Sequence, residues 1–215
     1  MDALRRVHNA KKRELILNNV KQDDYVLDCG CGRGGDLHKW KTVGAFVVGV
    51  DPDAESLNEA TQRAKDIQFE SFVVAQGDVR DAVSLGPFDV VCYNFSIHYI
   101  FDSLEESALA LAACIRPGGK LIGITPDEKL IRKFASPDSL GNTIEIIDPR
   151  HIAVRLVDGP FYAQGAKVEP MIDRTILEKA ISKWFTLESW TPMISKKTGC
   201  ISDIYSTFIF RRNTR

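Results

Sequence analysis

The sequence has 215 residues, and its 28 Lys plus Arg against 29 Asp plus Glu give a formal net charge of -1. This balance excludes a protein that coats long nucleic acid through phosphate neutralisation alone, although it leaves room for a local basic pocket. Hydrophobic residues at 44% and charged residues at 27% exclude a disordered chain. The length suits one α/β unit, so we predict a single domain over residues 1–215.

Two compositional features bear on the setting of the protein. No apolar run approaches the ~20 residues that cross a bilayer, and the first six residues lack the apolar stretch of a signal peptide. The five cysteines are scattered without a CxxC pair, which indicates reduced thiols and no metal site. We therefore expect an intracellular protein with no membrane partner.

The first 125 residues alternate helices and strands. An amphipathic helix with a basic face is predicted over residues 3–20. The short apolar runs that follow predict strands at 25–28, 45–51, 71–75, 88–93 and 120–125, and helices at 36–43, 54–65 and 104–115. Because such alternation produces a parallel sheet covered on both faces, this part is predicted to be doubly wound.

After Pro126 the pattern changes. Residues 142–147 and 152–157 alternate like antiparallel strands around a turn at Asp148-Pro149, and we interpret about 136–170 as an insertion that covers a site. A helix at 175–183 and strands at 185–190 and 204–210 complete the chain.

A glycine loop lies between the first strand and its helix. In Asp28-Cys29-Gly30-Cys31-Gly32-Arg33-Gly34-Gly35, the glycines allow a tight turn and a close approach to a ligand. The loop also fits a dinucleotide fingerprint, since Asp51 follows Gly30 at about the ~20 residues expected for a ribose-binding acid. A nicotinamide dehydrogenase is therefore one enzyme hypothesis, and Arg33 would then meet the pyrophosphate.

Acidic residues near three strand ends favour a different cofactor. Asp28 precedes the loop, Asp51 ends the second strand and Asp78 follows the third. In S-adenosylmethionine enzymes such acids meet the methionine portion, the ribose and the adenine in that order. The plain alternative is that these residues only form tight turns and solvated strand ends, but the coincidence of motif and strand context favours a cofactor site.

Four segments carry a resemblance to a known family. They are Val26 to Trp40, with the glycine loop; Arg5 to Ile16, with His8-Asn9 and Lys12; Asn94-Phe95-Ser96-Ile97-His98-Tyr99; and the closing Ile204 to Arg212. Together they resemble the motifs of mRNA cap (guanine-N7) methyltransferases, in the same order and over nearly the whole chain. The resemblance implies a doubly wound, mostly parallel, seven-stranded Rossmann-like methyltransferase sheet. Its last strand would be antiparallel, and a small β insertion would follow strand five.

The resemblance also implies roles for individual residues. The cofactor would be S-adenosylmethionine, leaving as S-adenosylhomocysteine, and the cap guanine and its phosphates would lie beside it. The implied cofactor residues are Lys12, Asp28, Gly30, Gly32, Asp51, Asp78, Asn94 and Tyr99. The implied cap residues are His8, Asn9, Arg33, Lys39, Arg63, His98, Pro126, Glu169 and Tyr205.

The implied reaction needs no general base. Guanine N7 carries a lone pair and no proton, so the enzyme must mainly hold nucleophile, methyl group and sulfur in line. His98, Tyr99 and Glu169 would position the guanine, and no metal is expected. Glu169 would also favour the positive charge that methylation creates on the base.

The leading hypothesis is therefore methyl transfer to guanine N7 of a capped RNA 5′ end. Its alternatives are a small-molecule methyltransferase of the same fold, or a catalytically silent methyltransferase-like subunit that binds RNA or activates a partner. Capping-enzyme domains or an activating subunit are the further partners that the resemblance suggests. The location would be the nucleus for a cellular protein, and the host cytoplasm or virion for a viral one.

Overall fold

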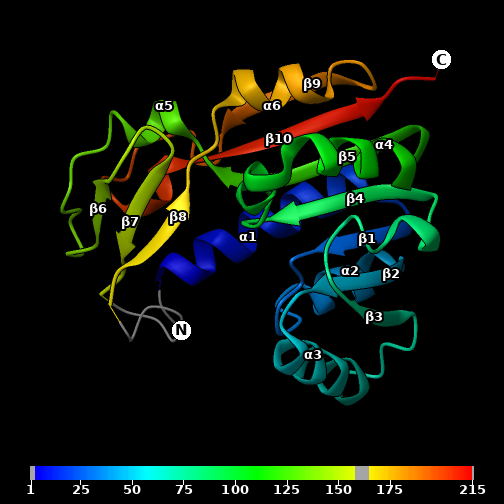
Figure 1. Ribbon diagram of the computed structural model, residues 1–215. Coiled ribbons are helices and arrows are strands. Elements are labelled where there is room, and N and C mark those ends of the chain that lie inside the picture. The colour runs from blue at the N-terminus through cyan, green and yellow to red at the C-terminus, as the bar shows by residue number, and fades with distance from the viewer. Residues whose placement is uncertain (1–2, 158–164, 215) are drawn as a thin grey trace.

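The computed structural model describes residues 3–157 and 165–214, so residues 158–164 of the predicted insertion lie outside the described residues. Its main feature is a seven-stranded sheet in the order β3-β2-β1-β4-β5-β10-β9 (Figure 1). The strands are β1 (Tyr25–Cys29), β2 (Phe46–Asp51), β3 (Phe72–Gln76), β4 (Phe88–Asn94), β5 (Ile115–Pro126), β9 (Phe185–Pro192) and β10 (Tyr205–Arg212).

The strand directions confirm the predicted sheet. Strands β3, β2, β1, β4 and β5 pair in parallel, whereas β10 runs antiparallel to both of its neighbours, β5 and β9. In the central strand β4 every residue except Asp89 is buried, because a parallel strand is covered on both faces and therefore consists of a continuous apolar run. The antiparallel β10 separates this sheet from the order 3-2-1-4-5-6 of classical dinucleotide-binding folds.

Helices cover both faces of the sheet, as predicted. One core packs α4 and α6 against the strands, with Leu111 and Leu177 fully buried, and the other packs α1, α2 and α3, with Ile16 and Trp40 fully buried. The α-helices are α1 (Ala3–Asn19), α2 (Leu37–Val43), α3 (Ala54–Asp66), α4 (Leu104–Cys114), α5 (Glu128–Ile131) and α6 (Arg174–Ile181), and the 3-10 helices are η1 (Val83–Leu85), η2 (Ile97–Ser103) and η3 (Ile201–Ile204).

A second, three-stranded antiparallel sheet follows β5 in the chain. It has the order β6-β7-β8, with bounds Thr143–Ile146, His151–Arg155 and Lys167–Pro170. In Figure 1 it lies beyond the carboxyl ends of β4 and β5. This confirms the predicted small β insertion. The strand β8 was not predicted, because Lys-Val-Glu-Pro is short and offers only one strongly apolar side chain.

The chain leaves the sheet directly after the fourth strand. Strand β4 ends at Asn94, and His98 and Tyr99 lie in η2. Phe95 adopts a left-handed backbone with φ 66°, which a continuing strand does not allow. The chain therefore turns at Phe95, and η2 carries His98 and Tyr99 past the edge of the sheet.

Candidate functional site

The glycine loop joins β1 to α2 and keeps an open space beside it. Gly30 and Gly32 have φ of 72° and 50°, which side-chain-bearing residues rarely adopt. A Cβ on Gly30 would lie 2.5 Å from the Cβ of Ser96, whose hydroxyl donates to the Cys29 carbonyl at 2.6 Å. A Cβ on Gly32 would meet nothing within 4 Å. The loop is thus packed tightly on one side and leaves room for a ligand on the other.

The three predicted acids lie on neighbouring strands near the same sheet edge. Asp51 accepts hydrogen bonds from the backbone N–H groups of Gly32 at 2.9 Å and Asp53 at 3.0 Å, so it also shapes the loop. Asp78 accepts from the side chain of Arg80 at 3.0 Å and from its backbone N–H at 2.8 Å. Asp51 therefore contacts the glycine loop at Gly32, whereas Asp28 lies in β1 before the loop and Asp78 follows β3.

Asp28 is buried, and its surroundings change the pH at which its carboxyl group loses a proton. The indole N–H of Trp40 donates to its carboxylate at 2.8 Å. Burial, and next the charge of Asp36, raise the pKa of Asp28 from its ordinary value of 3.8 to about 7. The carboxyl group therefore holds a proton at pH values where most acids in the chain are ionised.

This shift predicts a pH dependence of stability that belongs to Asp28. Between about pH 4 and about pH 7 the folded chain binds the Asp28 proton and the unfolded chain does not. The contribution of this group therefore falls as pH rises, by up to about 1.4 kcal/mol per pH unit. We expect Asp28→Asn to remove this slope. The free energy of unfolding of the variant should therefore increase relative to that of the native chain as pH rises. Urea unfolding of both chains across this pH range measures the difference, and parallel curves would contradict the assignment.

A second buried acid, Asp36, stands at the end of the glycine loop and was not predicted to have a role. Its carboxylate meets the ammonium groups of Lys12 at 3.0 Å and Lys39 at 2.7 Å, and accepts from the side-chain amide of Asn94 at 3.0 Å. Burial alone would raise its pKa, but the two lysines hold the pKa of Asp36 below its usual range. Asp36 thus joins α1, the glycine loop and the end of β4.

Lys39 lies inside this network. Besides Asp36, its ammonium donates to the Asn9 side-chain oxygen at 3.1 Å and to the Gly35 carbonyl at 3.2 Å, and the residue is only 5% exposed. The ammonium therefore makes one ion pair and two hydrogen bonds inside the fold. A contact between Lys39 and a cap phosphate stays a prediction, and it would require one of these bonds to open. What the structure does place here is Asn9, held against the glycine loop through Lys39.

Arg33 and Arg63 converge on one carboxylate. Arg33 in the glycine loop lies 3.3 Å from the Glu59 carboxylate, and the Arg63 guanidinium contacts the other oxygen of the same group. Both arginine side chains are about half exposed. Two cations therefore share the single charge of Glu59 beside the glycine loop.

Aromatic rings from three distant segments form one cluster. The ring of His8 in α1 stacks on Phe95 with centroids 4.9 Å apart, and Tyr205 in β10 meets both rings edge-on. The Lys12 ammonium lies 5.4 Å from the Phe95 ring centroid. His8 also bonds the Ser202 hydroxyl at 3.0 Å. Phe95 was missed as a site residue, although it stands inside the Asn94 to Tyr99 motif.

Next to this cluster, the structure brings together the three residues predicted to position a base. His98 Nε2 lies 3.9 Å from a Glu169 carboxylate oxygen, and the rings of His98 and Tyr99 have centroids 4.1 Å apart. Burial, followed by the charge of Glu169 and a hydrogen bond to it, raises the pKa of Tyr99 to about 12. Burial and the Glu169 charge also raise the pKa of Tyr205. Pro126 is the strand partner of Tyr205, so it belongs to the same wall.

His98 is a buried side chain whose ring nitrogens are available for hydrogen bonding. It is 2% exposed, and within residues 3–157 and 165–214 neither ring nitrogen has a hydrogen-bond partner. Burial lowers the pKa of His98 to about 3, so the ring is neutral at physiological pH and offers one donor and one acceptor. The buried side-chain oxygen of Asn94 likewise has no hydrogen-bond partner in the described part of the chain. Unsatisfied buried polar atoms are costly, which indicates that a ligand completes this site.

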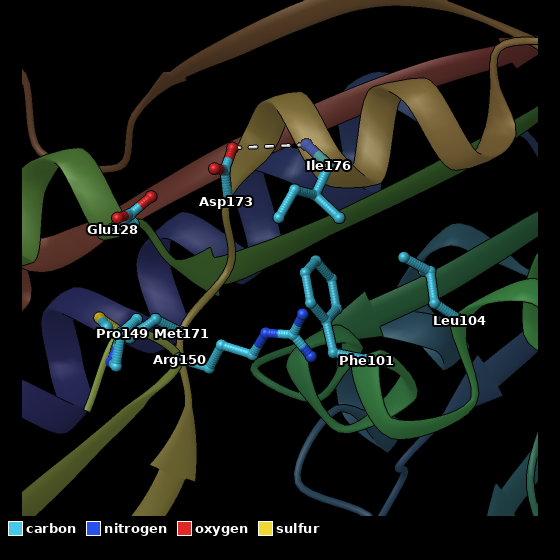
Figure 2. Close-up of a pocket in the computed structure, with 8 residues that line it drawn as sticks. All are labelled: Phe101, Leu104, Glu128, Pro149, Arg150, Met171, Asp173 and Ile176. Atoms are coloured by element: carbon cyan, nitrogen blue, oxygen red, sulfur yellow. Dashed lines mark hydrogen bonds between the residues drawn. The ribbon is translucent and has the colours of Figure 1, made fainter. Parts of the chain in front are cut away.

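A cavity of about 150 Å³ lies close to this site but is separate from its side chains. Figure 2 shows Phe101 from η2 and Ile176 from α6 facing one another across it. The Asp173 carboxylate caps α6 by accepting from the Ile176 N–H at 3.4 Å. The full lining is Phe101, Leu104, Glu128, Pro149, Arg150, Met171, Asp173 and Ile176. Phe101, Glu128 and Met171 each follow a predicted site residue by two positions in the sequence.

Two further observations concern the described residues as a whole. They contain no group of three or more His, Cys, Asp or Glu side chains arranged to hold a metal ion. None of their helices has both the length and the apolar character needed to cross a bilayer.

Comparison with known proteins shows a sequence relationship. The family model for the mRNA (guanine-N7)-methyltransferase domain matches residues 2–153. The mRNA cap guanine-N7 methyltransferase of Saccharomyces cerevisiae is 33% identical over 164 residues, which is 66% of this chain and 38% of that protein. The mRNA cap guanine-N7 methyltransferase 1 of Arabidopsis thaliana is 33% identical over 165 residues, which is 66% of this chain and 44% of that protein. The chain therefore spans less than half the length of these relatives.

Solved structures show the same fold at lower identity. A protein from Pyrococcus horikoshii OT3 superposes with a TM-score of 0.73 at 20% identity, covering 99% of this chain and 92% of its own. An S-adenosylmethionine-dependent methyltransferase from Clostridium acetobutylicum ATCC 824 gives 0.68 at 17% identity, covering 97% and 92%.

Proposed function

The chain belongs to the mRNA (guanine-N7)-methyltransferase family, and from this premise we propose that it methylates guanine N7 of a capped RNA 5′ end. The observation that carries the proposal is the convergence of Glu169, His98, Tyr99, Phe95 and Tyr205 beside the glycine loop. These residues come from three widely separated parts of the chain. In this proposal residues 1–215 form one methyltransferase domain, and 136–170 covers the cap site.

The residues around the glycine loop fit S-adenosylmethionine. Its carboxylate needs a cation, which Lys12 supplies, and its ribose hydroxyls need an acid, which Asp51 supplies at the open side of Gly32. Asn94 offers a buried oxygen that has no hydrogen-bond partner within the described residues, suited to an amino group. Asp28, Gly30 and Asp78 complete the proposed cofactor set with Tyr99. When bound, S-adenosylmethionine supplies the electrophilic methyl group of the reaction and leaves as S-adenosylhomocysteine.

The aromatic cluster and Glu169 suit a purine. Phe95, Tyr99 and Tyr205 offer ring faces and edges, and stacking on such rings is worth ~1–3 kcal/mol per base. His98 presents an unused donor and acceptor at the buried end of the pocket, and Pro126 forms its wall. His8 lies stacked on Phe95, so a base that stacks there must share or replace that ring contact. Asn9, held by Lys39, lies on the side of the glycine loop.

The site has the features expected for methyl transfer to a nitrogen lone pair. Guanine N7 has no proton to remove, so the residues need to orient the base and exclude water, a contribution of ~7–11 kcal/mol in well-oriented reactions. Methylation makes the purine cationic. The negative charge of Glu169 therefore favours the transition state over the neutral substrate. His98, with a pKa of about 3, stays neutral and adds no opposing charge.

We expect Arg33 and Arg63, whose side chains are half exposed, to bind the cap phosphates. The double variant Arg33→Ala, Arg63→Ala should raise the KM for capped RNA roughly 10-fold and leave that for guanosine nearly unchanged, because guanosine carries no phosphate. The slope of log KM against log salt should fall by about 0.7 for each phosphate that is no longer neutralised. Arg174→Ala is the matched control, since Arg174 makes a similar 3.3 Å ion pair with Glu178 on α6. Equal effects on RNA and guanosine would contradict this assignment.

The decisive experiment is transfer of labelled methyl from S-adenosylmethionine to RNA ending in an unmethylated guanosine cap, with uncapped RNA beside it. Nuclease digestion then locates the label. Cap-dependent label on guanine N7 is expected. Label on a small acceptor instead would favour a small-molecule methyltransferase, and cofactor binding without transfer would favour a silent RNA-binding or activating subunit.

The proposed setting follows from the proposed substrate. A cellular form would act in the nucleus, where capping occurs, and a viral form in the host cytoplasm or virion. Capping-enzyme domains or an activating subunit are the proposed protein partners, and methylation assays with and without cellular extract would detect an activator.

A further inference from the structure

Asp127 is a buried carboxylate at the end of β5, immediately after Pro126, and it is only 6% exposed. Its Oδ2 accepts hydrogen bonds from the Trp190 indole N–H in β9 at 2.7 Å and from the Ser206 hydroxyl in β10 at 2.6 Å. Its Oδ1 accepts from the Lys129 backbone N–H at 2.9 Å and caps α5. Short bonds to a carboxylate are among the stronger hydrogen bonds in proteins. This one side chain therefore fastens three elements together.

The backbone around Asp127 extends the junction to the small sheet. The Asp127 N–H donates to the Ile204 carbonyl at 2.9 Å, and Asp127 forms an isolated parallel bridge with Ile172. The next residue, Glu128, donates its N–H to the Ile172 carbonyl at 3.0 Å. Ile204 directly precedes Tyr205, and Ile172 lies three residues after Glu169. The junction thus connects both segments that carry pocket residues.

The two halves of the proposed guanine pocket meet at this junction. Pro126 and Tyr205 belong to the main sheet and pair with one another, whereas Glu169 belongs to β8 of the small sheet. We infer that Asp127 is a positioning residue that sets the separation between the Tyr205 wall and the Glu169 carboxylate. This inference rests on the proposed function. Misplacement of a reacting group by about 1 Å can cost 10²-fold in rate, so a fixed junction matters for turnover.

Two of the proposed cofactor residues lie away from this junction. Asp51 ends β2 and Asp78 follows β3, on the other side of β1 from β5 in the strand order. A loosened junction should therefore lower the activity on capped RNA and leave the affinity for S-adenosylmethionine nearly unchanged. A general loss of folding would impair both, which gives the test a readout that separates positioning from structural support.

The test compares Asp127→Ala with Ser206→Ala and with the conservative Asp127→Asn, each below its unfolding temperature. We expect Asp127→Ala to lower turnover on capped RNA by ~10-fold or more and to leave the Kd for S-adenosylmethionine within ~2-fold. Ser206→Ala removes one donor and should lower turnover by ~2- to 3-fold, and Asp127→Asn, which keeps one acceptor oxygen, should fall between. Asp173→Asn is the control, since Asp173 also caps a helix but contacts neither β9 nor β10.

A double variant with Glu169→Gln adds a second criterion. If Asp127 acts by placing Glu169, its replacement should cost much less in the Glu169→Gln background than in the native chain. An unchanged turnover, an equal loss of cofactor affinity, or fully additive effects would overturn the inference while wild-type methylation stands. A wild-type chain that neither binds nor methylates capped RNA would overturn the proposed function and this inference together. If Asp127→Ala does not fold, Ser206→Ala and Asp127→Asn decide by the same measurements.

Discussion

Asp36→Ala is expected to lower the free energy of unfolding by roughly 3–5 kcal/mol, because removing one partner of a buried ion pair leaves the others uncompensated. Lys12 and Lys39 would then keep two ammonium groups near each other without the carboxylate that lies between them at 3.0 and 2.7 Å. Asn94 would also lose the acceptor of its amide. Cofactor affinity should fall at least ~10-fold as well, since Lys12 and Asn94 would no longer be held in place.

Urea unfolding and calorimetric titration with S-adenosylmethionine measure these two effects. Glu14→Ala is the matched control, because Glu14 pairs with Lys11 at 2.8 Å on the exposed side of the same helix, α1. Exposed pairs contribute only ~0–1 kcal/mol, so this variant should unfold nearly as the native chain does. An Asp36→Ala chain as stable as the Glu14→Ala chain would show that the network does not hold the loop.

Glu169→Ala is expected to reduce turnover on capped RNA by ~10²- to 10³-fold, the usual effect of removing one preorganised electrostatic group. The carboxylate is 9% exposed and lies against His98 and Tyr99, so its charge acts in a site with little water. The Kd for S-adenosylmethionine should stay nearly constant, because the proposed cofactor residues other than Tyr99 lie away from Glu169. Steady-state kinetics with calorimetry separates the two quantities.

Glu145→Ala provides the control on the same small sheet. Glu145 is exposed in β6 and pairs with Ala153, whereas Glu169 pairs with the buried Ile152 on the opposite face. The control should therefore retain native turnover. Native turnover in Glu169→Ala would mean that another group stabilises the charge on the methylated base.

The sheet could be predicted because its signals are local. Apolar runs such as Val47-Val48-Gly49-Val50 indicate buried strands by themselves, and alternation with helices then dictates a parallel arrangement. The glycine loop is local too, since Gly30 and Gly32 need backbone angles that other residues avoid. The four-residue strand β8 was missed because its sequence has little of either signal.

For the candidate site, the sequence proposed residues but could not predict their contacts. The motif from Asn94 to Tyr99 pointed to His98 and Tyr99, yet it did not show that Phe95 turns the chain and stacks on His8. Lys39 was expected at the cap, and only the fold showed that its ammonium meets Asp36, Asn9 and Gly35 instead.

The sequence by itself thus determined the parallel sheet, the loop and the family, because neighbouring residues encode backbone conformation and burial. The tertiary structure alone decided which polar groups share a partner. Asp36 reaches Asn94 and Asp127 reaches Ser206 across long stretches of chain, and no local pattern specifies such pairs. A buried carboxylate must find donors wherever the packed elements bring them, so its partners are set by the completed fold.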